Sequence, residues 1–119
     1  MTVEMVLKAI QEARAISGQD LSGLNFSGLN MTGADLSGSN LSKCNFSGTI
    51  LQSADLSDCN LCDTNLQGAN LSKSSIYNAD LSGAKMRRAN LTHANRTSAK
   101  ISKWAMKGVY ITGPTAYSE

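Results

Sequence analysis

The chain has 119 residues, a formal net charge of +2 at pH 7 and only 5% aromatic residues. This length allows one domain, the composition excludes a core of large aromatic side chains, and the three cysteines fit a reducing compartment better than a disulfide scaffold. No apolar stretch is long enough to span a membrane, and Glu4 and Lys8 interrupt the only candidate for a secretory signal. We therefore expect a cytoplasmic protein, with non-classical export as an effector as the alternative.

Residues 1–17 are predicted to form a short capping helix. Thr2 can serve as its N-cap, and Gly18 marks a plausible stop. An amphipathic helix beside the open end of a repeat array has an immediate use in covering that end. A helix that binds a membrane surface or a partner is the alternative. The predicted apolar face consists of Val3, Val6, Leu7, Ile10 and Ala13.

Residues 18–113 are dominated by a repeat of five residues. From Ile16 onward, every fifth residue is large and apolar for sixteen consecutive positions. Most of these centres are preceded at two places by a small residue and at one place by Asp or Asn, as in Ala79-Asp80-Leu81-Ser82-Gly83. The predicted core column is Leu21, Phe26, Met31, Leu36, Leu41, Phe46, Leu51, Leu56, Leu61, Leu66, Leu71, Ile76, Leu81, Met86 and Leu91.

A period of five residues fits neither an α-helix nor a simple strand. It requires a backbone that turns after every unit, so that each fifth side chain points into a common interior and stacked coils bury a continuous column. The repeat resembles the pentapeptide-repeat family, whose motif is A(D/N)LXX, over residues 16 to about 113. The resemblance implies an all-β fold, a right-handed quadrilateral parallel β-helix with 20 residues per coil, about five coils with the last one irregular, and a tail over residues 114–119.

Two residues break the repeat near the C-terminal end. Arg96 occupies a centre position, where a buried charge is costly unless it is paired. Trp104 occupies a small-residue position, where an indole does not fit beside the column. We expect the fifth coil to be distorted at both places and to act as a lid. The apolar residues of this end could close the rod, leaving a monomer, or contact a second copy in a homodimer; they are Trp104, Met106, Val109, Tyr110 and Ile111.

No catalytic, cofactor or metal site is predicted. His93 is the single histidine and lies at an outward corner position, and a rod filled with leucine offers no pocket for catalysis. Cys59 and Cys62 match C-x-x-C, but the period places one inward and the other outward, which argues against shared ligation. Cys62 points outward and is either a reactive or palmitoylated thiol or a neutral surface residue. We therefore predict that the protein is not an enzyme.

Charge is distributed unevenly along the chain. Residues 1–80 carry four basic and eight acidic residues, whereas residues 81–119 carry seven basic and one acidic. A basic end could contact phosphate, anionic lipid or an acidic protein surface, or could simply solvate the end of the rod. The 20-residue coil stacks Lys107 on Arg87. The candidate binding patch consists of Lys85, Arg87, Arg88, Lys103 and Lys107.

These observations favour a rigid scaffold for protein–protein interaction, either a bacterial effector-type module or a cytosolic binding module. The resemblance also implies an alternative, because the quinolone-resistance members of the family mimic DNA and bind DNA gyrase as dimers. The basic terminal third disfavours that alternative. A second alternative is binding of a polyanion or an anionic lipid by the basic C-terminal end.

Overall fold

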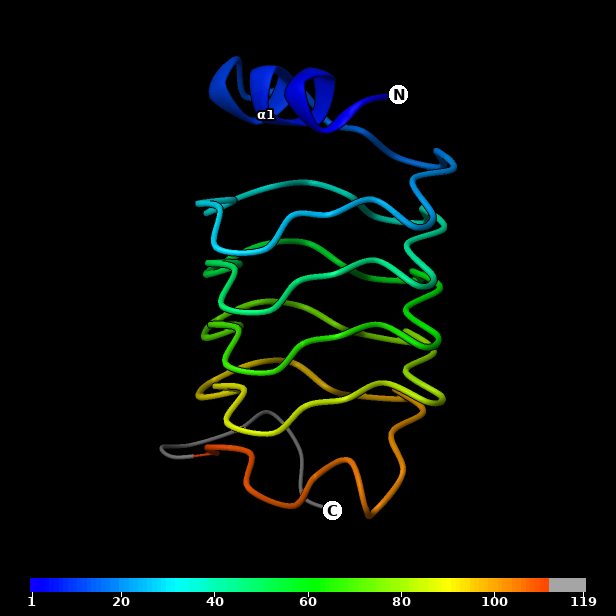
Figure 1. Ribbon diagram of the computed structural model, residues 1–119, viewed down its shortest axis with the longest axis vertical. Coiled ribbons are helices and arrows are strands. Elements are labelled where there is room, and N and C mark those ends of the chain that lie inside the picture. The colour runs from blue at the N-terminus through cyan, green and yellow to red at the C-terminus, as the bar shows by residue number, and fades with distance from the viewer. Residues whose placement is uncertain (112–119) are drawn as a thin grey trace.

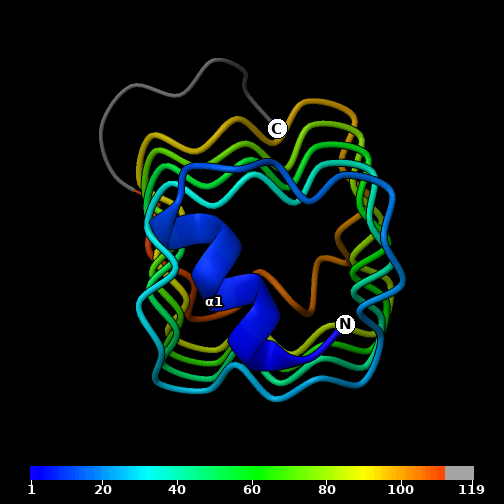
Figure 2. The ribbon, with the colours of Figure 1, turned by 90° about the horizontal axis from the view of Figure 1, so that it is seen from above.

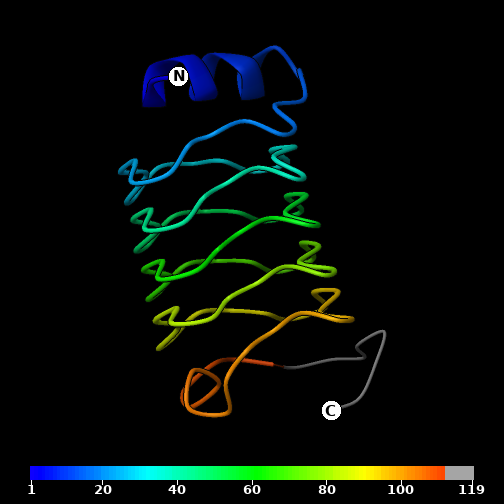
Figure 3. The same ribbon diagram turned by 90° about the vertical axis from the view of Figure 1, so that its right-hand side faces the viewer.

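The computed structural model of the chain describes residues 1–111. One helix, α1 (Val3–Gln11), precedes a coiled backbone that winds down the long axis of the molecule (Figures 1 and 3). The predicted tail and the predicted end of the repeat region at residue 113 lie outside the described residues. Within residues 1–111, no helix combines the length and the apolar character needed to cross a membrane.

The coil closes once every twenty residues. In the regular coils, isolated parallel bridges join residues that precede a centre to the residues twenty positions further on, as in Asp20 with Asn40 and Asn60 with Asp80. Viewed along the axis, the coils superimpose in a four-sided outline, and the chain runs clockwise away from the N-terminal end, which makes the superhelix right-handed (Figure 2). The all-β expectation needs one correction, because the sides are held by single-residue bridges and contain no extended strand among the described residues.

Each corner of the coil is a tight turn that places one residue in the left-handed region. The amide of Ala34 donates to the carbonyl of Met31 at 3.1 Å and closes one such turn. The residue two places after the centre has a φ between 58° and 75° in the regular repeats. Glycine fills this position often because it adopts positive φ without steric cost, yet Lys43 and Arg88 adopt it too.

The Asp or Asn before each centre has a structural role. Its side-chain oxygen accepts a hydrogen bond from the amide two residues further on, as Asn25 does from Ser27 at 3.0 Å and Asp80 from Ser82 at 3.0 Å. That amide does not take part in the ladder between coils, so the side chain satisfies a donor that would otherwise depend on water. The Asp/Asn preference of the motif follows from this local bond.

The predicted column of centre residues forms the core. All fifteen centres from Leu21 to Leu91 are buried, and the rings of Phe26 and Phe46 stack with centroids 5.3 Å apart. Polar side chains at the small positions are satisfied within the stack: the Thr49 hydroxyl donates to the Phe26 carbonyl at 2.8 Å. Side chains from successive coils therefore fill the interior with few unpaired polar groups.

Helix α1 lies across the first coil (Figures 1 and 2). Its N-cap is Thr2, whose hydroxyl accepts from the Met5 amide at 3.2 Å, and its inner face buries Val6 and Ala9 completely. The helix ends earlier than predicted. Ala13 adopts a φ of 56° and is exposed, so it ends the helix rather than extending its apolar face, and Gly18 already belongs to the first coil.

Candidate functional site

Among the described residues, the fifth coil leaves the ladder on one side. Bridges from Asn95 and Lys100 to the fourth coil are regular on both sides of Arg96, and pairing is again regular at Tyr110. The prediction that the coil would be distorted at Arg96 is therefore wrong. Up to residue 111, the irregularity is confined to residues 102–108, called here the displaced segment.

Trp104 explains where the displacement occurs. The same column position holds Cys44, Thr64 and Ala84 in the preceding coils, and all three are buried. Trp104 is 79% exposed instead, because the space beside the column does not accommodate an indole. The displaced segment, orange in Figure 2, runs inside the four-sided outline of the other coils rather than along its edge. Its Ala105 amide donates to the Ser102 hydroxyl at 3.0 Å.

The displacement uncovers residues 83–87 of the fourth coil, called here the rim. One coil earlier, the amides of Asp63 and Leu66 donate to carbonyls of the next coil at 2.9 and 2.7 Å. The equivalent amides of the rim, Gly83 and Met86, have no acceptor within residues 1–111, and the Ala84 carbonyl has no donor there. The rim is thus an open edge of the ladder.

A second change in the rim adds a third unpaired donor. Asn25, Asn45 and Asn65 occupy one column and accept from the amide two residues on, at 3.0, 2.9 and 3.1 Å. Lys85 replaces Asn in the fourth coil and cannot accept. The Arg87 amide therefore also lacks an acceptor among the described residues.

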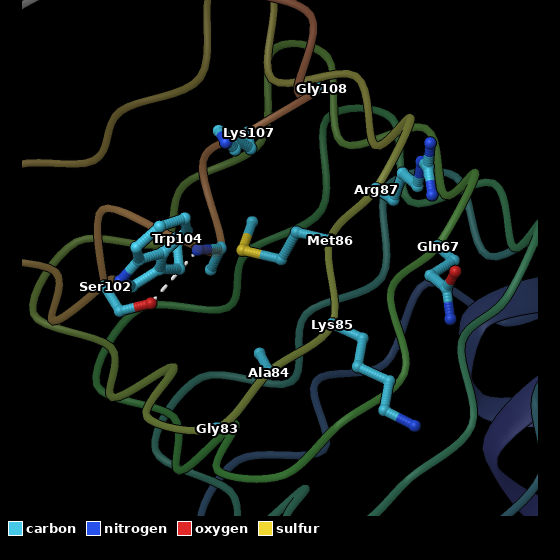
Figure 4. A pocket seen from close by; sticks show the side chains of 11 residues that line it. Gln67, Gly83, Ala84, Lys85, Met86, Arg87, Ser102, Trp104, Lys107 and Gly108 are labelled. Atoms are coloured by element: carbon cyan, nitrogen blue, oxygen red, sulfur yellow. Dashed lines mark hydrogen bonds between the residues drawn. The ribbon is translucent and has the colours of Figure 1, made fainter.

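A cleft of about 700 Å³ separates the rim from the displaced segment (Figure 4). Three cationic residues, Lys85, Arg87 and Lys107, are part of its lining, and the Lys107 ammonium lies 4.9 Å from the centroid of the Trp104 ring. Lys107 does not stack on Arg87 in the ladder as predicted, because it belongs to the displaced segment, but both residues line this basic cleft. Its lining is Gln67, Gly83, Ala84, Lys85, Met86, Arg87, Ser102, Trp104, Ala105, Lys107 and Gly108.

The structure divides the remaining predicted site residues between other places. Arg88 lies at a corner outside the lining of the cleft, and its amide donates to the Gly108 carbonyl at 2.9 Å. Tyr110 is 55% exposed and remains in the ladder. A hollow of about 300 Å³ at the C-terminal end collects Lys103 and the predicted end-contact residues Met106 and Ile111, with Arg96, Ala99 and Ile101.

The Arg96 side chain is buried, with 6% of its surface exposed, so it does not escape to solvent. Its Nη1 donates to the Met106 sulfur at 3.9 Å. This arrangement places a charge at the bottom of the apolar column, next to the hollow rather than in the basic cleft.

The cysteines are free thiols with different surroundings. Burial raises the pKa of Cys44 to about 11 and that of Cys59 to about 12. Each of these thiols donates to a carbonyl of the preceding coil at 3.0 Å. Cys62 is only half-buried, and desolvation raises its pKa as well. Raised thiol pKa values oppose nucleophilic reactivity. No group of three or more metal-binding side chains occurs within residues 1–111.

Two features of the site were not predicted from the sequence: the unpaired amides of the rim and the grouping of Trp104 with the basic residues. The first carried a visible signal, because Lys85 interrupts a column of asparagines. The second depends on the path of the displaced segment, and no repeat position indicates that path.

Comparisons with known proteins agree with this architecture. The sequence profile described as Pentapeptide repeats matches eight copies, within residues 16–48, 54–93 and 69–103. Among solved structures, the pentapeptide repeat protein alr5209 from Nostoc PCC 7120 is 28% identical over 93% of this chain and 96% of that chain, with a TM-score of 0.68. The pentapeptide repeat protein Rfr23 from Cyanothece 51142 is 24% identical over 98% and 100%, with a TM-score of 0.49.

QnrB1, a plasmid-mediated fluoroquinolone resistance protein, is 18% identical over 80% of this chain and 68% of that chain, with a TM-score of 0.32. That likeness is too low to carry an argument. No curated protein sequence is significantly similar to this chain.

Proposed function

The chain belongs to the pentapeptide repeat family, and we propose that it acts as a non-enzymatic, rigid scaffold that binds another protein through its surface. Side chains fill the interior of the first four coils, and the basic cleft and the hollow described above both lie at the fifth coil. The outer surface is therefore what the molecule offers to a partner. Helix α1 is proposed to cap the opposite end, because it covers the first coil with Val6 and Ala9.

The observation that carries this proposal is the exposure of Trp104 beside the basic cleft. Large aromatic residues with a polar edge and arginine are enriched in the energetically important centres of protein interfaces. Here an indole that is 79% exposed lies next to Lys107, across the cleft from Arg87. A partner that binds at the basic cleft would bury the exposed apolar surface of this indole.

The DNA-mimic alternative receives no support at this end of the molecule. Residues 81–111 carry seven basic residues and no acidic one, whereas a mimic of duplex DNA presents negative charge. Binding of gyrase therefore stays a prediction that a supercoiling assay can test. Binding of a polyanion or a lipid surface through the same basic residues is addressed by the controls below.

The proposal is tested by capture and reconstitution. The full chain is immobilised, proteins retained from an extract of the source cell are identified, and each is purified and titrated calorimetrically against the full chain. We expect a saturable 1:1 complex with one protein. Retention of only nucleic acid or lipid, or loss of every interaction upon purification, would contradict the scaffold function.

A further inference from the structure

Because the displaced segment does not pair with the rim, one side of the fifth coil is missing from the ladder. We propose that the basic cleft binds an extended, acidic peptide segment of a partner protein, which pairs with the rim in place of the missing side of that coil. The inference rests on the proposed scaffold function and specifies the chemistry of the partner.

The backbone groups of the rim have the pattern that pairs with a neighbouring coil. In the regular coils, the residue that precedes a centre donates its amide to the preceding coil and accepts from the next amide of that coil. Asn65 shows this, since its amide donates to the Cys44 carbonyl at 3.1 Å and its carbonyl accepts from the Phe46 amide at 2.7 Å. The rim offers the same pair without partners among residues 1–111, the Ala84 carbonyl and the Met86 amide. One residue of an extended peptide, lying parallel to the rim, satisfies both groups.

The groups around the paired peptide residue favour an acidic side chain at that position. In the three coils above, an Asn oxygen accepts from the amide at the position that Arg87 occupies in the rim. Lys85 removes that acceptor and places a cation at the same point. A carboxylate from the peptide can accept from the Arg87 amide and meet the Lys85 ammonium. Charge-assisted bonds of this kind are stronger than neutral ones.

The side-chain pattern expected of the peptide follows from the alternation of exposed and buried side chains along the rim. Lys85 and Arg87 are exposed, whereas Met86 between them is buried. Figure 4 shows the Lys85 and Arg87 side chains leaving the rim on the side away from Trp104, while Met86 points toward the displaced segment. A paired peptide therefore needs acidic residues on either side of one apolar residue, in the order acid, apolar, acid.

Duplex DNA and lipid headgroups fit the rim less well. Phosphate oxygens can accept from the Gly83, Met86 and Arg87 amides, but they provide no donor for the Ala84 carbonyl. A peptide backbone provides alternating donors and acceptors at the spacing that the rim presents.

One acid lies beside the rim: the Asp63 carboxylate contacts the position that a Cβ on Gly83 would occupy. The Asp63 carboxylate repels a second carboxylate at that corner. The acidic residues of the peptide are therefore expected next to Lys85 and Arg87.

The probe is a fluorescein-labelled peptide, Ser-Gly-Asp-Leu-Asp-Gly-Ser, titrated with the full chain by anisotropy at low and high salt. Trp104 is the single tryptophan of the chain, so its fluorescence gives an independent report from the cleft. We expect saturable binding that weakens with salt, and an effect of K85Q/R87Q of about tenfold or more. The matched control K43Q/K73Q removes two exposed lysine charges at corners of earlier coils and should leave the affinity unchanged.

N-methylated peptides separate backbone pairing from charge attraction. Methylation of the first aspartate amide removes the donor to the Ala84 carbonyl and should weaken binding by about tenfold. Methylation of the second aspartate amide is the control, because the equivalent amide of a regular repeat takes no part in the ladder. All protein variants are checked by thermal unfolding.

Each outcome decides the proposal. Binding that depends on K85Q/R87Q and on the first N-methyl group supports it. Absence of peptide binding at low salt, equal affinity for both methylated peptides, or tighter binding of duplex DNA or anionic vesicles would overturn it. A purified natural partner whose affinity is unaffected by K85Q/R87Q would leave the scaffold function standing and overturn this inference alone.

Discussion

The fourth and fifth coils occupy neighbouring levels of the same rod, yet only one of them completes all four sides. On the side that differs, the fourth coil places Ala84 beside Met86, and the fifth places Trp104 beside Met106. Ala84 and Met86 are buried, while Trp104 is exposed and Met106 is only half-buried. One oversized residue at a small position is thus accompanied by the loss of the local pairing.

The comparison also shows which irregularities the coil tolerates. Arg96 puts a charge at a centre position, and the bridges on both sides of it remain intact. A long flexible side chain at the end of the column can adapt, because its guanidinium reaches Met106 at the bottom of the stack. A rigid indole at a position that faces the preceding coil cannot adapt in this way, so the backbone moves.

The two coils should differ most in how much a centre side chain contributes to the free energy of unfolding. Leu61 is completely buried in mid-column, so L61A should cost about 2–5 kcal/mol through lost transfer energy and the cavity left behind. Met106 in the irregular coil is half-buried, so M106A should cost about 1 kcal/mol or less. Urea unfolding of the two variants measures both values. Equal costs would mean that the fifth coil is packed as tightly as the third.

The buried thiols should make the regular coils sensitive to alkaline pH. The pKa of Cys44 rises from 9.0 to about 11 and that of Cys59 from 9.0 to about 12, so the folded state retains protons that the unfolded state loses. Their contribution is complete below pH 9 and disappears as the pH rises toward 11–12. C44A/C59A should flatten the fall of the unfolding free energy between pH 9 and 11, by on the order of 2 kcal/mol for each thiol.

Cys62 provides the control for that pH series, because it is half-buried at the surface. C62A should leave the fall of stability with pH almost unchanged. An identical pH profile for the wild type and C44A/C59A would contradict the burial of these thiols.

Replacing Trp104 tests the cause of the displacement. W104A restores the alanine that the motif favours, so the segment should return to the ladder and the protein should gain about 1 kcal/mol of stability. The regained bonds should also close the basic cleft. Thermal unfolding and amide exchange at the rim measure the change. A loss of stability would indicate that the exposed indole stabilises the end of the rod through contacts of its own.

Arg96 is expected to give the smallest effect. R96L places the usual centre residue at the bottom of the column and should be neutral or stabilising by less than about 1 kcal/mol. Urea unfolding is again the measurement. Marked destabilisation would show that the guanidinium makes an interaction that leucine cannot replace.

The regular coils could be predicted almost completely from the sequence. A strict period of five residues assigns every side chain to the interior, a corner or an outer face, so the core from Leu21 to Leu91 follows from the register alone. The N-terminal helix could be recognised, but its end could not be placed, because Ala13 takes a backbone conformation that its identity does not favour.

The site could be predicted only in part. The excess of basic residues and the misfit of Trp104 follow from the sequence, but the register wrongly stacked Lys107 on Arg87. Lys103, also part of the candidate binding patch, lines the hollow at the C-terminal end. Once a segment leaves the ladder, its path depends on the balance of lost bridges and new contacts, such as that between Ala105 and Ser102. A repeat pattern contains no information on that balance.

Amide hydrogen exchange at the rim measures whether the fifth coil leaves one edge of the ladder open. Gly83 and Met86 are compared with Asp63 and Leu66, their equivalents one coil earlier, in the full chain by NMR. We predict that the two earlier amides exchange at least about a hundredfold more slowly than the two rim amides. Equal protection of Gly83 and Met86 would show that the ladder is complete and would contradict the account.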